Sequence, residues 1–567
     1  MKKWRKALIF SGVLLLLTFG IAAMASAAGP ILRFCWDVDG REISILPFEK
    51  KERTWVLFVP AALKGKDPVI RIDQDTDLVW GDQTIPNGGT LKVEQFLGQP
   101  VTAAFATGRR IGEVTVMMGS EIPSLFFTID PDELRRINAN TKLTIRKDGS
   151  LIMLNGDGSI GAEDSVPGFK TRGNSTFFAG KRAFQFKMEH KAPLCGMERN
   201  KTWILLANWF DISLVRTQMV FDLYRDMGMK YTPDCRQAEL YINGSYYGTY
   251  LLTEKIQMKK GRLEITDLEE ALEGLNGEDA YDGAAWRKGR GKIVSRMRWF
   301  DIQEPEDITG GFLLEIEKEL HYSQMNDVAG FVTEKGTCVV IKEPTHAGPL
   351  AVEYMANLFN DFHSAVLRKD GTSKDSGKYY ASFIDMRSFA LKIIMDEFST
   401  NYEVRAGSQF LYKDSDRVNG KLYAGPPWDY DLSFGNKDDG VRNPRKKDYV
   451  FNRSSSEVYL PHWLLTHDDF RMITRQLYDE VFLPAAEVLA GRREPSEKSS
   501  VRPIQAYQDA IRDSAAMNFT RWSARAIPDV WNSSGRSFED AGAFLQNWIS
   551  ERLDLMTESW LLEEDGK

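Results

Sequence analysis

The spacing of apolar and polar residues changes along the chain, and these changes divide the chain into three stretches. Between about Ile31 and Val116, short apolar runs such as TWVLFVP, PVIRID and EVTVMM are separated by Gly, Asp and Pro, which is typical of β-strands joined by turns. Further on, strand-like runs mix with helical patterns, and from about residue 461 helical patterns dominate. The pattern predicts an α+β protein in which a small all-β, sandwich-like module at residues 28–117 precedes a larger domain at 118–567 with a helical C-terminal part.

The larger domain contains several segments with clear local signals. Apolar residues recur at every fourth position from Val215 to Met227, which predicts an amphipathic helix. The segment CRQAELYINGSYYGTYLLTEKI has Asn-Gly between two apolar arms and predicts a β-hairpin that ends at Glu254. In KRAFQFKM, two phenylalanines alternate with polar residues, so Lys187 should project from the polar face of a strand. A charged, Gly-rich stretch at about 268–307 predicts an irregular insertion.

The N-terminal segment has the pattern of an export signal. A Lys/Arg-containing start is followed by an apolar run from Ala7 to about Ala23 and by small residues at Ala25 and Ala27. This pattern predicts a signal peptide at residues 1–27 that is cleaved near Ala27. An uncleaved membrane anchor is the alternative, because the run is close to the lower length limit for a membrane span. With no second long apolar run, we expect a secreted or cell-envelope protein without a membrane span after cleavage.

Composition excludes several classes of function. The formal net charge is −7 and the 27% charged residues are mixed in sign, so the chain lacks the basic field of nucleic-acid binding proteins. The four Cys and six His show neither CxxC nor HExxH spacing, and they predict no zinc site. No GxSxG, SxxK or Walker A segment is present, which removes the common hydrolase and P-loop classes.

The segment GPPWDYDLSFGN carries the clearest candidate chemistry. Asp429 and Asp431 stand two positions apart, so in an extended strand both carboxylates point the same way and offer oxygen ligands to a hard divalent cation. A solvated, Asp-rich turn beside a core Trp is the alternative. Together with a strand lysine, Lys187, and a glutamate at a hairpin end, Glu254, these residues form the set that phosphoryl transfer requires.

Several separated segments, in this order, resemble the CotH kinase family of secreted or spore-coat atypical protein kinases. They are RGNST, KRAFQFKM, KTWILLANWFDISLVRTQMVFDL, AELYINGSYYGTYLLTEKI and PPWDYDLSFGN. The likeness runs from about Ser120 to Trp560 and includes an N-x-x-R-W element that begins at Asn518. The resemblance implies a divergent protein-kinase-like fold that binds ATP and Mg²⁺ and phosphorylates Ser or Thr of a protein at the cell surface or spore coat.

The resemblance also implies roles for individual residues. Asp429 matches the metal-binding Asp of the family, and Asp431 is the neighbouring acid that supports the metal. Lys187 is the best match for the strand lysine that contacts nucleotide phosphate, with Lys181 as a second candidate. Glu254 matches the glutamate at the hairpin end.

The catalytic loop departs from the family pattern. The family commonly has N-x-D with an Asn five residues beyond the Asp, whereas this chain has Asn401, Glu403 and Ser408 at these positions. Glu403 can accept a proton and Ser408 can offer the metal an oxygen, but the additional methylene moves the carboxylate by more than about 1 Å, which can cost about 100-fold in rate. Asp396 and Asn401 form a second frame with the same spacing. We rank it lower because Asp396 lies in a helical pattern.

Three hypotheses about function follow. The first is an exported kinase that transfers the γ-phosphate of ATP to Ser or Thr of a surface or spore-coat protein with Mg²⁺. The second is a weakened or inactive relative that acts as an envelope scaffold or adhesin, which the substitutions at Glu403 and Ser408 suggest. The third is a carbohydrate-active enzyme, which would require Glu403 and Asp429 to face each other across an open saccharide groove.

Overall fold

The computed structural model describes residues 31–562, apart from 140–148, 174–175, 177–178, 278–285, 289–295, 326, 402, 438–442, 447–448, 454–455 and 524–535. The predicted signal peptide at residues 1–27 lies outside the described residues. Among the helices that are described, none combines the length and apolar character needed to cross a membrane. All four cysteines of the sequence carry free thiols.

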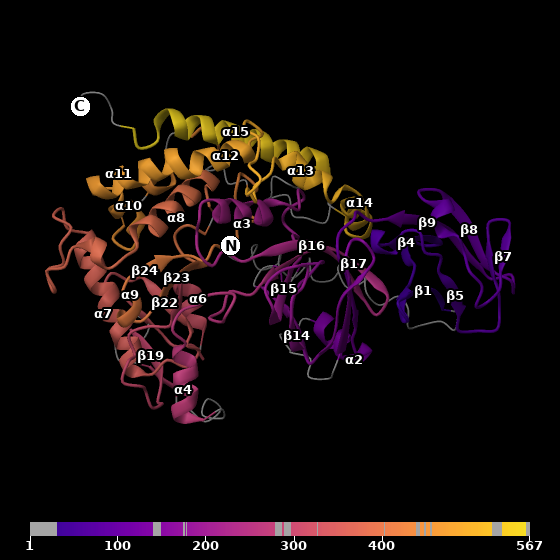
Figure 1. The fold of residues 1–567 in the computed structure, drawn as a ribbon, viewed down its shortest axis with the longest axis horizontal. Helices are drawn as coiled ribbons and strands as arrows, with labels where there is room; N and C mark the ends of the chain where they lie inside the picture. Colours follow the sequence, from indigo (N-terminus) through magenta and orange to yellow (C-terminus); the bar gives the residue numbers. More distant parts are fainter. Residues whose placement is uncertain are drawn as a thin grey trace, which may run out of the picture.

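Residues 32–118 form two β-sheets (Figure 1), and their buried side chains make up most of one apolar core, which Leu154, Tyr241, Tyr246 and Met517 complete. A three-stranded sheet has the order β2 (Arg41–Ile45), β1 (Leu32–Val38), β5 (Val69–Ile72). A six-stranded sheet has the order β3 (Phe48–Lys51), β4 (Thr54–Val59), β9 (Arg110–Met118), β8 (Pro100–Phe105), β6 (Leu78–Trp80), β7 (Gln83–Ile85). Buried aromatic residues such as Phe34, Trp36 and Trp80 fill the core. The predicted all-β region at the N-terminus is therefore confirmed.

A central sheet of eight strands follows. Its order is β12 (Ile160–Val166), β11 (Gly149–Leu154), β10 (Ser124–Thr128), β16 (Cys235–Ile242), β17 (Ser245–Glu254), β15 (Asn200–Leu206), β14 (Ala183–Ala192), β13 (Gly168–Arg172). The strands β16 and β17 pair as the predicted hairpin. At its tight turn, Asn243 and Gly244 adopt the positive φ values that such a turn requires. Helix α3 (Arg216–Asp226), at the predicted helical segment, places Phe221 against the sheet at Cys235 and Leu251.

A second large sheet has seven strands. Its order is β18 (Trp286–Lys288), β19 (Met297–Phe300), β21 (Gly330–Val332), β22 (Cys338–Glu343), β20 (Phe312–Glu317), β23 (Gln409–Lys413), β24 (Leu422–Ala424). Helices α7 (Pro349–Val366) and α8 (Met386–Ser399) share one apolar core with it. The buried face of α7 follows its apolar periodicity, whereas α8 is buried on all sides from Ser388 to Ser399. Within the stretch 268–307, which was expected to be irregular, α4 (Leu268–Asn276), β18 and β19 are regular elements.

The C-terminal part is helical, as predicted. It contains α10 (Leu460–Leu464), α11 (Asp468–Leu477), α12 (Leu483–Leu489), α13 (Ile504–Asp509), α14 (Arg512–Arg521) and α15 (Phe538–Ser559). Figure 1 shows these helices as a layer along one side of both large sheets. Three other short helices, α2 (Pro131–Asn138), α6 (Glu319–Gln324) and α9 (Asp416–Asn419), lie between strands of the large sheets in the sequence.

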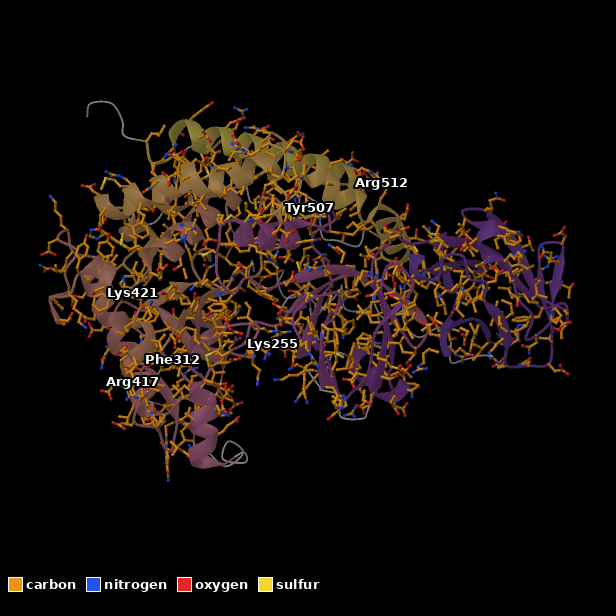
Figure 2. The ribbon with its side chains drawn as sticks, viewed as in Figure 1. Lys255, Phe312, Arg417, Lys421, Tyr507 and Arg512 are labelled. Carbon is orange, nitrogen blue, oxygen red and sulfur yellow. The ribbon has the colours of Figure 1, made fainter. Side chains whose placement is uncertain are left out.

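Helix α14 links the helical layer to the rest of the chain. Its Met517 is part of the core of the N-terminal β region, and its Asn518 accepts a hydrogen bond of 3.2 Å from the backbone of Thr249 on β17. In Figure 2, Lys255, which follows β17, lies between the two large sheets, and Phe312 marks the start of β20 beyond it. The structure is thus a mixed α/β protein with an all-β start and a helical end.

Candidate functional site

A cavity of about 360 Å³ collects charged residues from both large sheets. The eight-stranded sheet contributes Arg172, the last residue of β13. The seven-stranded sheet contributes Glu315 and Glu317, which share one face of β20, and Lys342 of β22. Two loops complete the lining, one between α8 and β23 and one after β24.

The loop between α8 and β23 presents Glu403 and Ser408 to this cavity. Its end is fixed to β20, because Gly407 N–H donates to the Ile316 carbonyl at 2.8 Å and Ser408 N–H donates to Glu315 Oε1 at 3.0 Å. Ser408 has a φ of +54°, a left-handed backbone that L-residues rarely adopt. The surrounding bonds therefore hold the Ser408 side chain in one orientation toward the cavity.

The loop after β24 presents Asp429 and Asp431. Asp429 has a φ of +66°, so the predicted extended strand for this segment is replaced by a turn, yet both carboxylates still line the cavity. Asn436 fixes the turn by donating to the carbonyls of Asp431 and Phe210, each at 2.7 Å. The turn is thereby tied to the segment that precedes α3.

The two loops meet at a hydrogen bond between predicted site residues. Ser408 Oγ donates to Asp429 Oδ2 at 3.1 Å, and Glu403 Oε2 lies 2.7 Å from Lys318 Nζ. The structure thus brings Glu403, Ser408, Asp429 and Asp431 to one cavity.

Asp429 experiences opposing electrostatic effects. Its side chain reaches the solvent of the cavity, but protein surrounds it closely, and this partial removal from water raises its pKa. The negative charge of Glu403 raises the pKa further. The hydrogen bond from Ser408 and the charges of Arg172 and Lys318 act in the opposite direction. A cation near Asp429 would therefore bind where negative charge is only partly balanced.

Asp431 is in a similar position. Burial raises its pKa well above the usual range, and the charge of Asp429 adds to the rise. Asp211 also raises this pKa, whereas Arg216 lowers it. The charge of Asp429 thus disfavours the ionised form of Asp431, and a cation bound near the two carboxylates would relieve this repulsion.

Arg172 is the cationic residue on the opposite side of the acids. Its guanidinium lies 5.2 Å from the centroid of the Trp428 ring, and its charge interacts with Asp429. Lys342 Nζ is 3.1 Å from Glu315 Oε2 at the same cavity. The sequence did not single out these two cations, although Arg172 is the first residue of the RGNST segment.

The two predicted strand lysines lie elsewhere. Lys187 is exposed on β14, opposite Gly168 and Thr202, and it does not line the cavity. Lys181 is buried, its Nζ donates to the Thr249 carbonyl, and it lies 4.4 Å from the centroid of the Tyr250 ring. Burial lowers the pKa of Lys181 well below its usual range. Neither lysine is brought to the acids, because Lys187 projects from the exposed face of β14 and Lys181 is buried against Thr249 and Tyr250.

Glu254 is also outside the cavity. Its Oε2 accepts from the backbone of Asp234 at 3.0 Å, and its Oε1 is 3.9 Å from Arg262 Nε. The strand register pairs Glu254 with Trp203, and Trp203 with Phe186. Directly paired residues share a face, so Glu254 and Lys187 project from opposite faces of the sheet. The expected partnership of this glutamate with a strand lysine is not formed.

Asp396, the acid of the second frame, is only 3% exposed and does not line the cavity. It lies within α8, as its helical pattern predicted. Glu403 is therefore the acid of this loop that reaches the cavity.

The cavity residues fit a metal ion that is held jointly by protein and phosphate oxygens, rather than one that is held by protein ligands alone. Within the described part of the chain, no group of three or more His, Cys, Asp and Glu side chains is arranged to hold a metal ion. Mg²⁺ commonly takes only one or two carboxylates from a protein and completes its shell with phosphate and water oxygens. The partly balanced carboxylates of Asp429 and Asp431, together with the Ser408 hydroxyl, fit that mode.

A second cavity, of about 470 Å³, lies beside α3, the start of β16 and α13. Its Arg225 is paired with Asp222 at 2.6 Å and with Asp234 at 3.3 Å. These charges already neutralise one another, so this cavity lacks the excess of acids that characterises the first.

Comparison with known proteins identifies the family of the chain. The family model described as CotH kinase protein matches residues 169–556, more than half of the chain, and the chain belongs to this family. The matched residues include both loops of the cavity and Arg172. Family membership indicates a kinase-like function. No curated protein matches the chain.

Proposed function

We propose that this protein is an exported, Mg²⁺-dependent phosphotransferase that moves the γ-phosphate of ATP to Ser or Thr of a protein at the cell surface or spore coat. The observation that supports this proposal most directly is that Glu403, Ser408 and Asp429 line one cavity. Arg172, at the end of β13 in the eight-stranded sheet, lines the same cavity. Two sheets around a central cavity also support the proposal of a divergent protein-kinase-like architecture. Export is proposed from the sequence of residues 1–27.

Each residue of the cavity has a chemical part in this proposal. Mg²⁺, when bound, would neutralise phosphate charge, and Asp429, Asp431 and Ser408 would hold it. Arg172 would bind phosphate oxygens in place of the expected strand lysine, since a guanidinium offers several donors in a fixed plane. The cation–π contact with the Trp428 ring, 5.2 Å from its centroid, would help to hold the guanidinium at the cavity.

Glu403 would accept the proton of the acceptor hydroxyl. Its carboxylate is held by Lys318 Nζ at 2.7 Å, and this contact fixes the direction in which the longer side chain points. The contact also explains how a glutamate can serve at the position where the family commonly has an aspartate. The additional methylene is accommodated by a cation that keeps the carboxylate at the edge of the cavity.

Phosphate transfer from labelled ATP provides the test. The full-length protein is incubated with γ-labelled ATP, Mg²⁺ and a Ser-rich acceptor protein, alongside Asp429→Asn and the control Asp370→Asn, which changes an exposed aspartate paired with Arg368. We expect label on the protein or acceptor with wild type and the control, and loss of label with Asp429→Asn. Absence of transfer by wild type, or equal transfer by Asp429→Asn, would refute the proposal.

The second candidate function is a nucleotide-binding scaffold without transfer activity. The observation in its favour is that Ser408 offers a single hydroxyl where the family commonly has an Asn. In that case, ATP with Mg²⁺ should raise the melting temperature of the protein, because a ligand of the native state stabilises it, but no label should be transferred.

A further inference from the structure

A buried ion pair on α8 lies next to the candidate site without lining it. Lys392 and Asp396 are one helical turn apart, their side chains are 9% and 4% exposed, and Lys392 Nζ contacts Asp396 Oδ2. The cost of burying two charges usually cancels much of their attraction, so stability alone is a weak reason for such a pair. The partners that surround it indicate a different reason.

The first connection leads to Glu403. Asn401 Nδ2 donates to Asp396 Oδ1 at 2.9 Å, and Asn401 Oδ1 accepts from the Glu403 backbone N–H at 3.0 Å. The Asn401 side chain thus joins the α8 carboxylate to the backbone that carries the proposed proton acceptor.

The second connection leads to the two aspartates. Tyr430, which stands between Asp429 and Asp431 in the chain, donates from its hydroxyl to Asp396 Oδ1 at 2.7 Å. The same hydroxyl is 2.7 Å from the hydroxyl of Tyr224 on α3. The backbone turn with the positive φ at Asp429 is therefore anchored one residue away by Asp396.

The third connection leads to Ser408. Lys392 Nζ donates to Gln409 Oε1 at 2.7 Å, and Gln409 is the residue that follows Ser408. One ion pair is thus bonded to three residues, each of which lies one or two positions from a residue of the site.

A neighbouring buried pair on the same helix serves as a comparison. Glu397, the next residue after Asp396, accepts from Arg552 of α15 and from the backbone of Val450 and Phe451. None of these partners lines the cavity. Two adjacent buried carboxylates of α8 therefore differ in direction: Glu397 contacts the helical layer and Asp396 contacts the site loops.

We propose that Asp396, together with Lys392, is a positioning residue that sets the mutual placement of Glu403, Ser408 and Asp429. This inference deepens the proposed function and rests on it. Two of the positioned residues, Ser408 and Asp429, have left-handed backbones, which persist only where surrounding contacts impose them. Loss of the connections should let these turns relax and separate the oxygens that would share the metal.

Three variants test the role of the pair. Asp396→Asn removes the charge and keeps the shape, whereas Tyr430→Phe removes only the hydroxyl that reaches Asp396 and leaves the ion pair intact. Glu397→Gln is the matched control, because it converts the adjacent buried carboxylate of the same helix. Two quantities are measured for each full-length variant: the affinity for Mn²⁺ with ADP, followed by the electron paramagnetic resonance of free Mn²⁺, and kcat and KM for phosphate transfer.

We expect Asp396→Asn and Tyr430→Phe to weaken Mn²⁺ binding at least fivefold and to lower kcat by roughly 100-fold for a displacement of about 1 Å, with KM for the acceptor little changed. Glu397→Gln should keep both quantities near wild type even if its melting temperature falls more. The inference would be overturned if the Mn²⁺ affinity and kcat fell in parallel with the melting temperature in all three variants. It would also be overturned if Tyr430→Phe matched wild type in both quantities.

The failure of the proposed function is a separate outcome. Wild-type protein that binds Mn²⁺ with ADP but transfers no phosphate would refute that function, and the positioning role would then be decided by the Mn²⁺ affinities alone. Wild-type protein that does not bind Mn²⁺ with ADP would overturn both.

Discussion

Gly407 offers a perturbation that changes the position of Glu403 without changing its chemistry. The residue is buried, has a φ of +90°, and donates its backbone N–H to Ile316 at 2.8 Å. A methyl group at this position would overlap Glu403 Oε2 and lie 3.2 Å from Lys318 Cε. Because the backbone is bonded to β20, the Glu403 carboxylate has to move in the Gly407→Ala variant.

The size of the effect follows from this geometry. Normal contact requires the carboxylate to move by about 1 Å, and misplacement of a reacting group by that distance can cost about 100-fold in rate. This corresponds to about 2.7 kcal/mol of activation free energy. The left-handed backbone adds a separate cost of about 1–2 kcal/mol to folding, since an alanine tolerates this conformation poorly.

A matched glycine separates the two costs. Gly88 has a φ of +88°, and a methyl group there would meet no atom within 4 Å. Gly88→Ala should therefore lose about 1–2 kcal/mol of stability without a change in kcat, whereas Gly407→Ala should lose a similar stability and about 100-fold in kcat. Urea unfolding and initial-rate assays with saturating ATP and acceptor measure the two quantities.

The double variant Glu403→Ala/Gly407→Ala tests the cause. With no carboxylate to displace, the second substitution should add nothing to the loss in kcat. A Gly407→Ala enzyme within threefold of Gly88→Ala in kcat would refute the reasoning. A further 100-fold loss in the double variant would show that the effect does not pass through Glu403.

Three further predictions concern charge. Arg172→Met should reduce kcat/KM for ATP by roughly 10- to 100-fold, which is the contribution of a charge-assisted hydrogen bond to phosphate. Lys187→Met should reduce it clearly less in the same assay, and the reverse order would contradict the placement of the phosphate. Arg552→Met should lower the free energy of unfolding by about 3–5 kcal/mol, because it removes the buried guanidinium that pairs with the Glu397 carboxylate. Urea unfolding that gives a loss of less than about 1 kcal/mol would contradict this. Burial raises the pKa of Glu239 to about 8 from its usual 4.5, so between these pH values the folded protein holds a proton that the unfolded chain has lost. The free energy of unfolding should accordingly fall as pH rises through this window, by up to about 1.4 kcal/mol per pH unit, and Glu239→Gln should flatten the profile measured by urea unfolding at pH 5, 6.5 and 8.

The local parts of the fold could be predicted because their causes are local. The Asn-Gly pair specifies the β16–β17 hairpin, and the fourfold apolar spacing specifies α3, since both patterns act over a few residues. The alternation around Phe186 correctly placed Lys187 on the exposed face of β14. The same alternation could not show that this face is remote from the cavity.

The site residues differ in predictability for a similar reason. Glu403, Ser408, Asp429 and Asp431 lie in two short loops whose residue types already suggest their chemistry. Arg172 joins them only because β13, more than 200 residues earlier than these loops, forms an edge of the eight-stranded sheet. Whether Arg172 lies near these loops depends on the order of the strands in the sheet, which no local sequence pattern specifies.

The positioning role of Asp396 could not be predicted from the sequence, for a different reason. Spacing from Asn401 made Asp396 a candidate for the catalytic acid, and the helical pattern argued against it. The structure shows that the spacing has a physical cause, because the amide of Asn401 reaches back to the Asp396 carboxylate at 2.9 Å. A spacing that resembles a catalytic motif here reflects a structural bond.

The contact between Glu397 and Arg552 has a consequence for the order of events in folding. The two residues are 155 positions apart, so the contact between this carboxylate of α8 and the Arg552 guanidinium forms only when α15 has docked. Contacts of such long range form late, since they require a large loop to close first. The helix that supports the site loops is therefore completed by a distant segment, and a chain whose α15 is cut away or misplaced should lose the site entirely instead of leaving an active fragment.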